Sequence, residues 1–269
     1  MLLDSLFDDI PLWGWALLTL VSLFSFYEGG FQLGKNRLLK GDKDFLSAPL
    51  FVAGILGATG LVLTLALMMA SSSFEEKRRL TWEDANTIEA AYLQAAYLPE
   101  VPRSTVRALL REYVNVRLQT AHPIAGESLI SLKERLGQGV VKSESLQEEL
   151  WNQAILIASQ DHQSVTDGLF LHSLSELIAL HSTRTSVSFR SQIPSAIWLG
   201  VYGLSFLSMS TIGYYSGWTH SRSHTLNLFF ALALSSVILL ARGLDRPWGG
   251  FFHISQQPLI NLAEKIDAI

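Results

Sequence analysis

The sequence predicts an all-α membrane protein with four transmembrane helices in a two-plus-two layout and a helical extramembrane segment between the two pairs. Four long hydrophobic segments contain no Asp, Glu, Lys or Arg: residues 10–27, 48–70, 194–215 and 226–241. A bilayer core of ~30 Å needs about 20 apolar residues at a rise of ~1.5 Å each. The composition is 49% hydrophobic and 16% charged, and the mean hydropathy is +0.27. An average soluble domain is ~25% charged, so these values favour a protein that lies in lipid.

The composition also limits the classes of function. A formal net charge of −4 argues against nucleic-acid binding, which requires a basic surface. The chain has no cysteine, so disulfides, thiolate catalysis and thiolate metal sites are excluded. The first ten residues contain Asp4, Asp8 and Asp9 and no Lys or Arg, which is unlike a signal peptide. We therefore expect the first span to be retained.

The ends of the hydrophobic segments predict four regions. Residues 1–70 and 194–243 are the two helix pairs, 71–193 is the helical segment, and 244–269 is a C-terminal turn and tail. The first span is expected to end at Glu28, Gly29 and Gly30. Four spans place both ends of the central segment on one side of the membrane. The flanking Lys and Arg residues favour a cytoplasmic central segment by a small margin, whereas the acidic N-terminus argues for the opposite orientation.

The central segment contains helical patterns throughout. The second span is expected to continue as a helix to residue 98, followed by a helix over residues 104–119. A short helix over 127–136 is expected to stop at Gly137 and Gly139. Ser145 and Glu148 form a capping-box pattern that predicts a long helix from there to about residue 190. We expect this segment to be too thin for a large core of its own, and to pack as an extension of the membrane helices and against neighbouring subunits.

Small or polar residues recur at helical spacing along one stripe of the second span. They are Gly57, Gly60, Thr64, Met68 and Ser71. Two interpretations are open: a close helix–helix contact, which small residues permit in lipid, or a pore-lining stripe. The basic run Lys77, Arg78 and Arg79 follows, and it is either a juxtamembrane anchor or a ring of charge at a pore mouth.

No catalytic or metal-binding motif is present. His172 and Glu176 lie four residues apart, with His181 further along, but no His-Glu-x-x-His zinc motif exists. Phosphate-binding and nucleophile-elbow patterns are also absent. We therefore expect no enzyme activity, no metal and no cofactor. The C-terminal run after the fourth span predicts a structural exit turn, formed by Asp245, Arg246, Pro247, Trp248 and Gly249.

Taken together, several runs resemble a family of largely uncharacterised bacterial membrane proteins described as bestrophin-like. These runs are residues 60–70, 74–79, 84–88, 91–93, 98–99, 109–114 and 244–249. The resemblance covers nearly the whole chain from the second span onward. Asp84 stands where the family tends to have Glu, and Trp248 stands where it tends to have Phe. Residues 251–254 are not acidic, so the resemblance carries over no calcium site.

The resemblance implies a fold, a function and partners. Bestrophins are pentameric anion channels in which the second membrane helix of each subunit lines the pore. By this likeness we expect a homo-oligomeric, anion-selective ion channel in a bacterial inner membrane, with the central segment in the cytoplasm. The expected partners are further copies of the chain, membrane lipid and a permeant ion. The alternative is a membrane-anchored helical scaffold or interaction protein without conduction.

Overall fold

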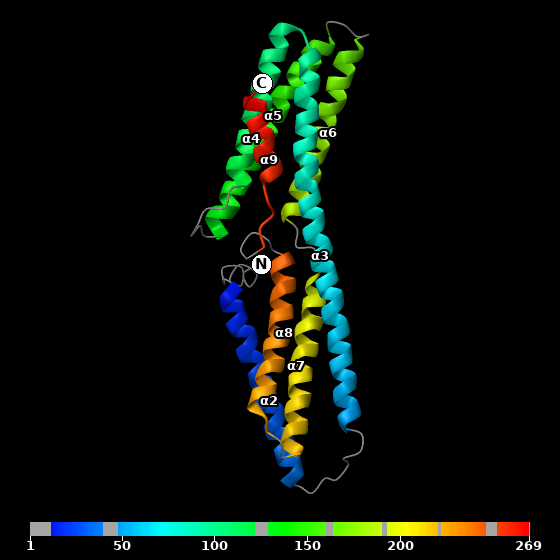
Figure 1. Ribbon diagram of the computed structural model, residues 1–269, viewed down its shortest axis with the longest axis vertical. Coiled ribbons are helices and arrows are strands. Elements are labelled where there is room, and N and C mark those ends of the chain that lie inside the picture. Colours follow the sequence, from blue (N-terminus) through cyan, green and yellow to red (C-terminus); the bar gives the residue numbers. More distant parts are fainter. Residues whose placement is uncertain are drawn as a thin grey trace. The chain divides into compact units, whose positions relative to one another are not determined.

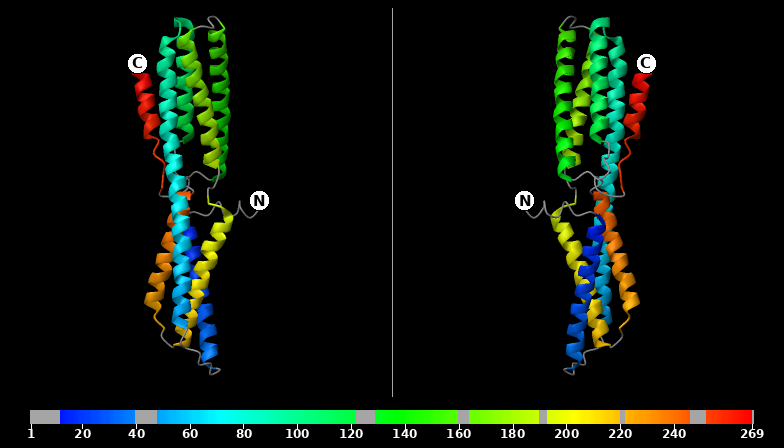
Figure 2. Two further views of the ribbon diagram at one scale, coloured as in Figure 1. Left: turned by 90° about the vertical axis from the view of Figure 1, so that its right-hand side faces the viewer. Right: turned by 90° about the vertical axis from the view of Figure 1, so that its left-hand side faces the viewer.

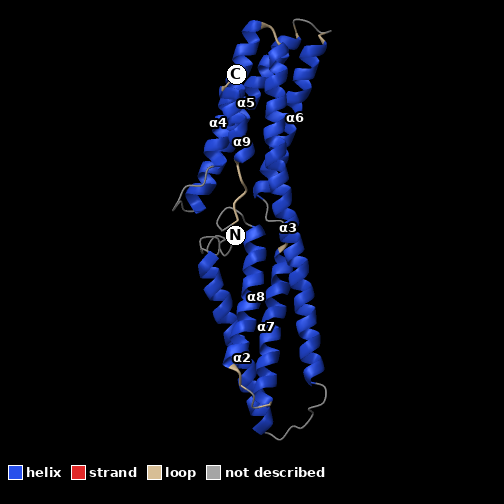
Figure 3. Cartoon of the chain, viewed as in Figure 1, coloured by secondary structure: helices blue, strands red, loops and turns tan. Residues whose placement is uncertain are grey.

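A computed structural model describes residues 12–39, 48–121, 129–159, 164–189, 193–219, 222–245 and 252–268. Every regular element in these ranges is a helix (Figure 3). The expected all-α fold is thus confirmed for the described part of the chain. The chain divides into two compact units: unit 1 is Met1–Phe74 with Ser191–His253, and unit 2 is Glu75–Arg190 with Ile254–Ile269.

Unit 1 contains α2 (Leu12–Leu39), α7 (Ser195–Trp218), α8 (His224–Asp245) and the first part of α3 (Ala48–Gln94). In Figure 1, α2, α7 and α8 lie against one another. Among the described residues, four helices are long and apolar enough to cross a membrane: Trp13–Asn36, Pro49–Tyr97, Ser195–Trp218 and His224–Asp245. The described residues of the four predicted hydrophobic segments fall on these helices.

A reciprocal glycine contact joins α2 and α7. A Cβ atom added at Gly30 would lie 2.0 Å from the carbonyl oxygen of Ser210, and one added at Gly213 would lie 2.1 Å from that of Tyr27. Gly34 and Gly217 make the same kind of contact one turn further along each helix. Two helices with small residues four apart can bring their backbones together, and the resulting van der Waals packing favours association of helices in lipid.

This contact explains why the expected end of the first span is wrong. Gly29 and Gly30 do not stop the helix, because α2 continues to Leu39. Gly30 is kept small by its contact with α7, not by a turn. Arg222, which lies between α7 and α8, pairs with Glu28 on α2, and its guanidinium lies 4.6 Å from the centre of the Phe31 ring.

Unit 2 is a helical bundle built from the remainder of α3, the short 3₁₀ helix η1 (Ala95–Tyr97), α4 (Glu100–Ala121), α5 (Leu129–Ala158), α6 (Val165–Phe189) and α9 (Gln257–Asp267). The longer helices of this bundle run alongside one another in both views of Figure 2. Its core contains fully buried side chains from five helices, including Ile88, Leu110, Leu150, Leu174 and Leu259. The expectation that this segment lacks a large core of its own is therefore wrong.

The helix boundaries in unit 2 also differ from those predicted. One helix, α5, runs through Gly137, Gly139 and Ser145 without a break, and α6 follows after a separate start. Gly139 marks a close approach, because a Cβ atom there would lie 2.2 Å from the hydroxyl oxygen of Thr120 on α4. The cap predicted at Ser145 occurs instead at Ser164, whose hydroxyl accepts a hydrogen bond from the Asp167 backbone N–H at 3.2 Å.

The C-terminal helix α9 packs on α4 within unit 2. Its apolar side chains Leu259, Leu262 and Ile266 are buried. Arg111 on α4 donates to the carbonyl oxygen of Ile266 at 3.0 Å and forms an ion pair with Asp267 at 3.1 Å. A guanidinium at this position satisfies a carbonyl at the C-terminal end of α9, where a positive charge is favourable.

Replacement of Gly213 by Ala tests the α2–α7 contact. The new Cβ atom would clash with a backbone oxygen that cannot move without shifting α2, so we expect a loss of about 1–3 kcal/mol in unfolding free energy. The measurement is thermal unfolding of the detergent-solubilised protein. Gly203→Ala is the control, because Gly203 is on the same helix and has nothing within 4 Å of an added Cβ. Equal melting temperatures for the two variants would contradict the prediction.

Candidate functional site

Within unit 1, α3 has a face that is covered by the other helices. Thr59, Leu63, Ala66 and Ala70 lie on this face and are buried. The Thr59 hydroxyl lies 2.6 Å from the Ser208 hydroxyl on α7, so the two share a hydrogen bond. These contacts set the rotation of α3 about its own axis, and so decide which of its side chains are turned away from unit 1.

The five predicted pore-lining residues, Gly57, Gly60, Thr64, Met68 and Ser71, all lie on the exposed side of α3. An added Cβ atom at Gly57 or Gly60 would meet nothing within 4 Å, and Met68 is 63% exposed. No polar group is left unsatisfied at Thr64, whose hydroxyl donates to the Gly60 carbonyl at 2.8 Å. We call these five residues the open face of α3. Within the described chain it is an uncharged surface that the chain's own helices leave uncovered.

The predicted basic cluster does not behave as one group. Lys77 is buried, whereas Arg78 and Arg79 are exposed. Arg78 pairs with Glu75 at 3.4 Å, and Arg79 pairs with Glu76 and Glu83, each at 2.9 Å. The two exposed arginines are therefore outnumbered by their three glutamate partners, and this group has no excess of positive charge.

Of the predicted C-terminal turn, only Asp245 is among the described residues; Arg246, Pro247, Trp248 and Gly249 lie outside them. Asp245 is buried at the end of α8, and its carboxylate accepts a hydrogen bond from the Ile193 backbone N–H at 3.3 Å. Ile193 lies just before the first residue of α7, where a negative charge is favourable for the helix dipole. Asp245 thus connects the end of α8 to the start of α7.

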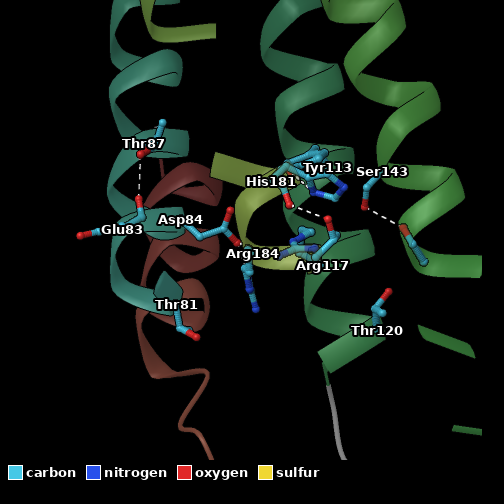
Figure 4. Close-up of polar contacts among 12 residues, drawn as sticks. Thr81, Glu83, Asp84, Thr87, Tyr113, Arg117, Thr120, Ser143, His181 and Arg184 are labelled. Carbon is cyan, nitrogen blue, oxygen red and sulfur yellow. Dashed lines mark hydrogen bonds and ion pairs between the residues drawn. The ribbon is translucent and has the colours of Figure 1, made fainter. Parts of the chain in front are cut away.

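The structure also contains a buried charged cluster that sequence reasoning missed. In unit 2, Asp84 from α3 is bound by two guanidiniums, Arg117 from α4 and Arg184 from α6 (Figure 4). The Arg117 Nη2 to Asp84 Oδ2 distance is 3.0 Å, and Arg184 donates to the same oxygen. Asp84 is 1% exposed and the Arg117 side chain is 8% exposed. We call these three residues, with His181 and Tyr113, the Asp84 cluster.

His181 and Tyr113 extend the cluster between α6 and α4. The Tyr113 hydroxyl lies 3.0 Å from His181 Nδ1 and accepts a hydrogen bond from Gln147 Nε2 on α5 at 3.1 Å. Because the hydroxyl oxygen accepts from Gln147, its own hydrogen is free to donate to Nδ1. This arrangement assigns the remaining proton of the neutral imidazole to Nε2.

Burial and the neighbouring charges determine how these groups ionise. Burial, followed by the charge of Arg117, lowers the pKa of His181 to about 4, so this imidazole is neutral at pH 7. Burial raises the pKa of Tyr113 to about 12. Burial and the charge of Arg117 lower the pKa of Arg184 to about 10, so Arg184 remains charged at pH 7. Burial disfavours the charged form of Arg117, but the Asp84 carboxylate outweighs the effect of burial and raises the pKa of the Arg117 guanidinium.

One sequence signal could have indicated the cluster. Asp84, Arg117 and Arg184 lie at helical spacing from the buried residues Ile88, Tyr113 and His181, so each places a charge on the buried stripe of its helix. A lone charge on such a stripe requires a partner from another helix. His172 and Glu176, by contrast, form an exposed pair at 3.5 Å. Across the residues that the structure describes, no group of three or more His, Asp or Glu side chains is placed to hold a metal ion.

Comparison with known proteins identifies the class. A family model described as Bestrophin-like domain matches residues 47–259, which is most of the chain. The chain therefore belongs to the bestrophin-like family, and it is an integral membrane protein. A search of curated proteins gives no match.

Solved structures share the fold at low sequence identity. The crystal structure of a bacterial bestrophin homolog from Klebsiella pneumoniae is 17% identical, with 94% of each chain covered and a TM-score of 0.61. A variant of that homolog is 15% identical, with 94% of this chain and 96% of that chain covered and a TM-score of 0.61. A crystal structure described as a membrane protein variant is 15% identical, with 95% of each chain covered and a TM-score of 0.64.

Replacement of Asp84 by Asn tests the role of the buried ion pair. The substitution leaves two buried guanidiniums without a carboxylate, and removing one partner of a buried pair typically costs about 3–5 kcal/mol of stability. Glu83→Gln is the control, because Glu83 is the neighbouring residue and forms an exposed pair worth at most about 1 kcal/mol. Denaturant or thermal unfolding of the purified protein measures both. A loss in Asp84→Asn no larger than that in Glu83→Gln would contradict the prediction.

Acid should destabilise unit 2 through His181. The pKa of this imidazole is about 4 in the folded protein and about 6.5 in the unfolded chain, so between these values the unfolded state binds more protons. Its contribution to stability is therefore complete above pH 6.5 and falls as the pH drops toward 4. The full effect is at most about 3 kcal/mol, since one pKa unit corresponds to ~1.36 kcal/mol.

Thermal unfolding at pH 7.0 and 5.0 measures this effect. His181→Gln should reduce the difference between the two pH values, whereas the exposed control His172→Gln should leave it unchanged. An unchanged pH difference in His181→Gln would assign the acid sensitivity to other groups.

Proposed function

We propose that this protein is a homo-oligomeric ion channel whose axial pore is lined by the open face of α3. The observation that carries the proposal is that all five residues of this face are exposed, uncharged and turned away from the chain's own helices. A polar hydroxyl at Thr64 and small side chains at Gly57 and Gly60 leave room for a hydrated path.

Self-association is part of the same proposal. One α3 helix cannot enclose a path by itself, so a pore requires the α3 helices of several copies around an axis. We propose a pentamer, which is what the resemblance to bestrophins implies, with the four spans in a two-plus-two layout. The protein would lie in a bacterial inner membrane, with residues 71–193 in the cytoplasm.

A narrow apolar section of the pore would act as the gate. Met68 is exposed on the open face, and Leu65 beside it is 51% exposed, whereas Leu63 is buried against the other helices. Met68 and Leu65 are therefore the residues that would form an apolar constriction, which conducts only when it is wetted.

The proposal takes anions as the permeant ions, as the resemblance implies. The basic cluster does not decide this selectivity, because Arg78 and Arg79 are each paired with glutamates. Reversal potentials under a salt gradient distinguish anion from cation permeation. The alternative function is a membrane-anchored scaffold, which is favoured by one observation: unit 2 has a core of its own and could present a binding surface without conduction.

Cysteine substitution tests the pore assignment directly. The chain has no cysteine, so each single variant reports on one position without background. We expect Thr64→Cys and Ser71→Cys to lose most of their current, roughly tenfold, when a charged thiol reagent is added to the reconstituted protein, because a bulky charge would block the narrow path.

Phe229→Cys on α8 is the matched control, since Phe229 is also exposed on a membrane helix but lies off α3. The measurement is single-channel current in planar bilayers. Conductance that the reagent leaves unaltered at both α3 positions would rule out the open face as the pore wall. Absence of conductance under any ion, voltage or pH would favour the scaffold.

A further inference from the structure

The Asp84 cluster of unit 2 contains one more positive charge than negative charge. Two guanidiniums, Arg117 and Arg184, surround a single carboxylate, and His181 and Tyr113 are neutral at pH 7. Asp84 is the carboxylate that acts on both guanidiniums. The excess charge is not at the surface, because Arg117 and Arg184 side chains are 8% and 11% exposed. An uncompensated charge inside a protein is costly, so a counter-charge is needed.

The cluster also contains buried donors that no described group accepts. Arg117 Nε and His181 Nε2 are both buried and have no hydrogen-bond partner among the described residues. The Nε2 atom carries a proton, because Nδ1 accepts from the Tyr113 hydroxyl. Arg117 and His181 are near neighbours in the cluster (Figure 4), and the charge of Arg117 acts on the imidazole. The two unused N–H groups therefore lie in the same cluster.

We propose that the Asp84 cluster binds one small monovalent inorganic anion of the halide class, held by the N–H groups of Arg117 Nε and His181 Nε2. Both donors are N–H groups and neither can coordinate a cation. A single negative charge balances the excess of one positive charge, whereas a divalent anion would leave a net negative charge buried. The bound anion would join α4 to α6 beside the Asp84 ion pairs, and would act as a structural counter-ion of unit 2.

This site is separate from the proposed pore. Its residues lie on α3, α4 and α6 of unit 2, and none belongs to the open face of α3. The anion is a stabilising ligand here and not a permeating one. Its binding is therefore measured by stability and diffraction, and the result does not depend on whether the protein conducts.

Bromide is the direct probe. Crystals of the full chain grown in sodium bromide should give an anomalous difference peak within hydrogen-bond distance of Arg117 Nε and His181 Nε2. A water molecule at that position, or a carboxylate from a neighbouring copy, would overturn the proposal.

Stability provides the second arm of the test. At constant ionic strength, replacing sodium gluconate by sodium chloride should raise the apparent melting temperature by roughly 2–4 °C, as expected for a ligand at several times its Kd. Arg184→Gln removes the excess charge but keeps the Asp84–Arg117 pair, so the chloride effect should disappear. Arg184→Lys keeps the charge and should retain it.

Lys142→Gln is the matched control, because it removes one positive charge from the exposed surface of the same unit and should leave the chloride effect intact. An equal chloride effect in Arg184→Gln and the parent protein would overturn the proposal. So would the absence of any chloride effect in the parent protein.

Discussion

The rotation of α3 is the constraint on which the functional interpretation depends. It is determined by contacts on one side of the helix: the Thr59–Ser208 hydrogen bond and the burial of Leu63, Ala66 and Ala70. These contacts turn the opposite side of α3, with its glycines and Thr64, away from the chain's own helices. A rotation of half a turn would bury that stripe against α7, and the small residues would then be ordinary packing positions.

The two units are stabilised by different forces. In a bilayer, apolar side chains gain little by leaving lipid for another helix, so unit 1 depends on close backbone approach. Gly30 and Gly34 lie against the α7 backbone, and Gly213 and Gly217 lie against the α2 backbone, which provides that approach between α2 and α7. Unit 2 instead has a core of buried aliphatic and aromatic side chains of the kind found in water-soluble bundles. A charged cluster sits inside this core, at a site where apolar side chains would cost less.

The Asp84 cluster is more informative as a constraint on geometry than as a source of stability. Two guanidiniums that share one carboxylate oxygen fix the mutual register of α3, α4 and α6. Burial keeps His181 neutral, and its hydrogen bond to Tyr113 orders the imidazole. The same arrangement leaves a net positive charge and two unused donors in the interior of unit 2.

The sequence alone determined the fold class and the four apolar segments, because a helix that crosses lipid needs a long uncharged run and the run is visible residue by residue. It also indicated the family and the stripe from Gly57 to Ser71, since a helical face repeats at a fixed spacing. Only the tertiary structure decided which glycines lie at helix contacts. The sequence indicated helix ends at Gly30 and Gly139, whereas in the structure each lies inside a helix, close to a neighbouring helix. The Asp84 cluster was also visible only in the tertiary structure. Its members are as many as 100 residues apart, and a single charged residue in a sequence does not indicate which distant residue it pairs with.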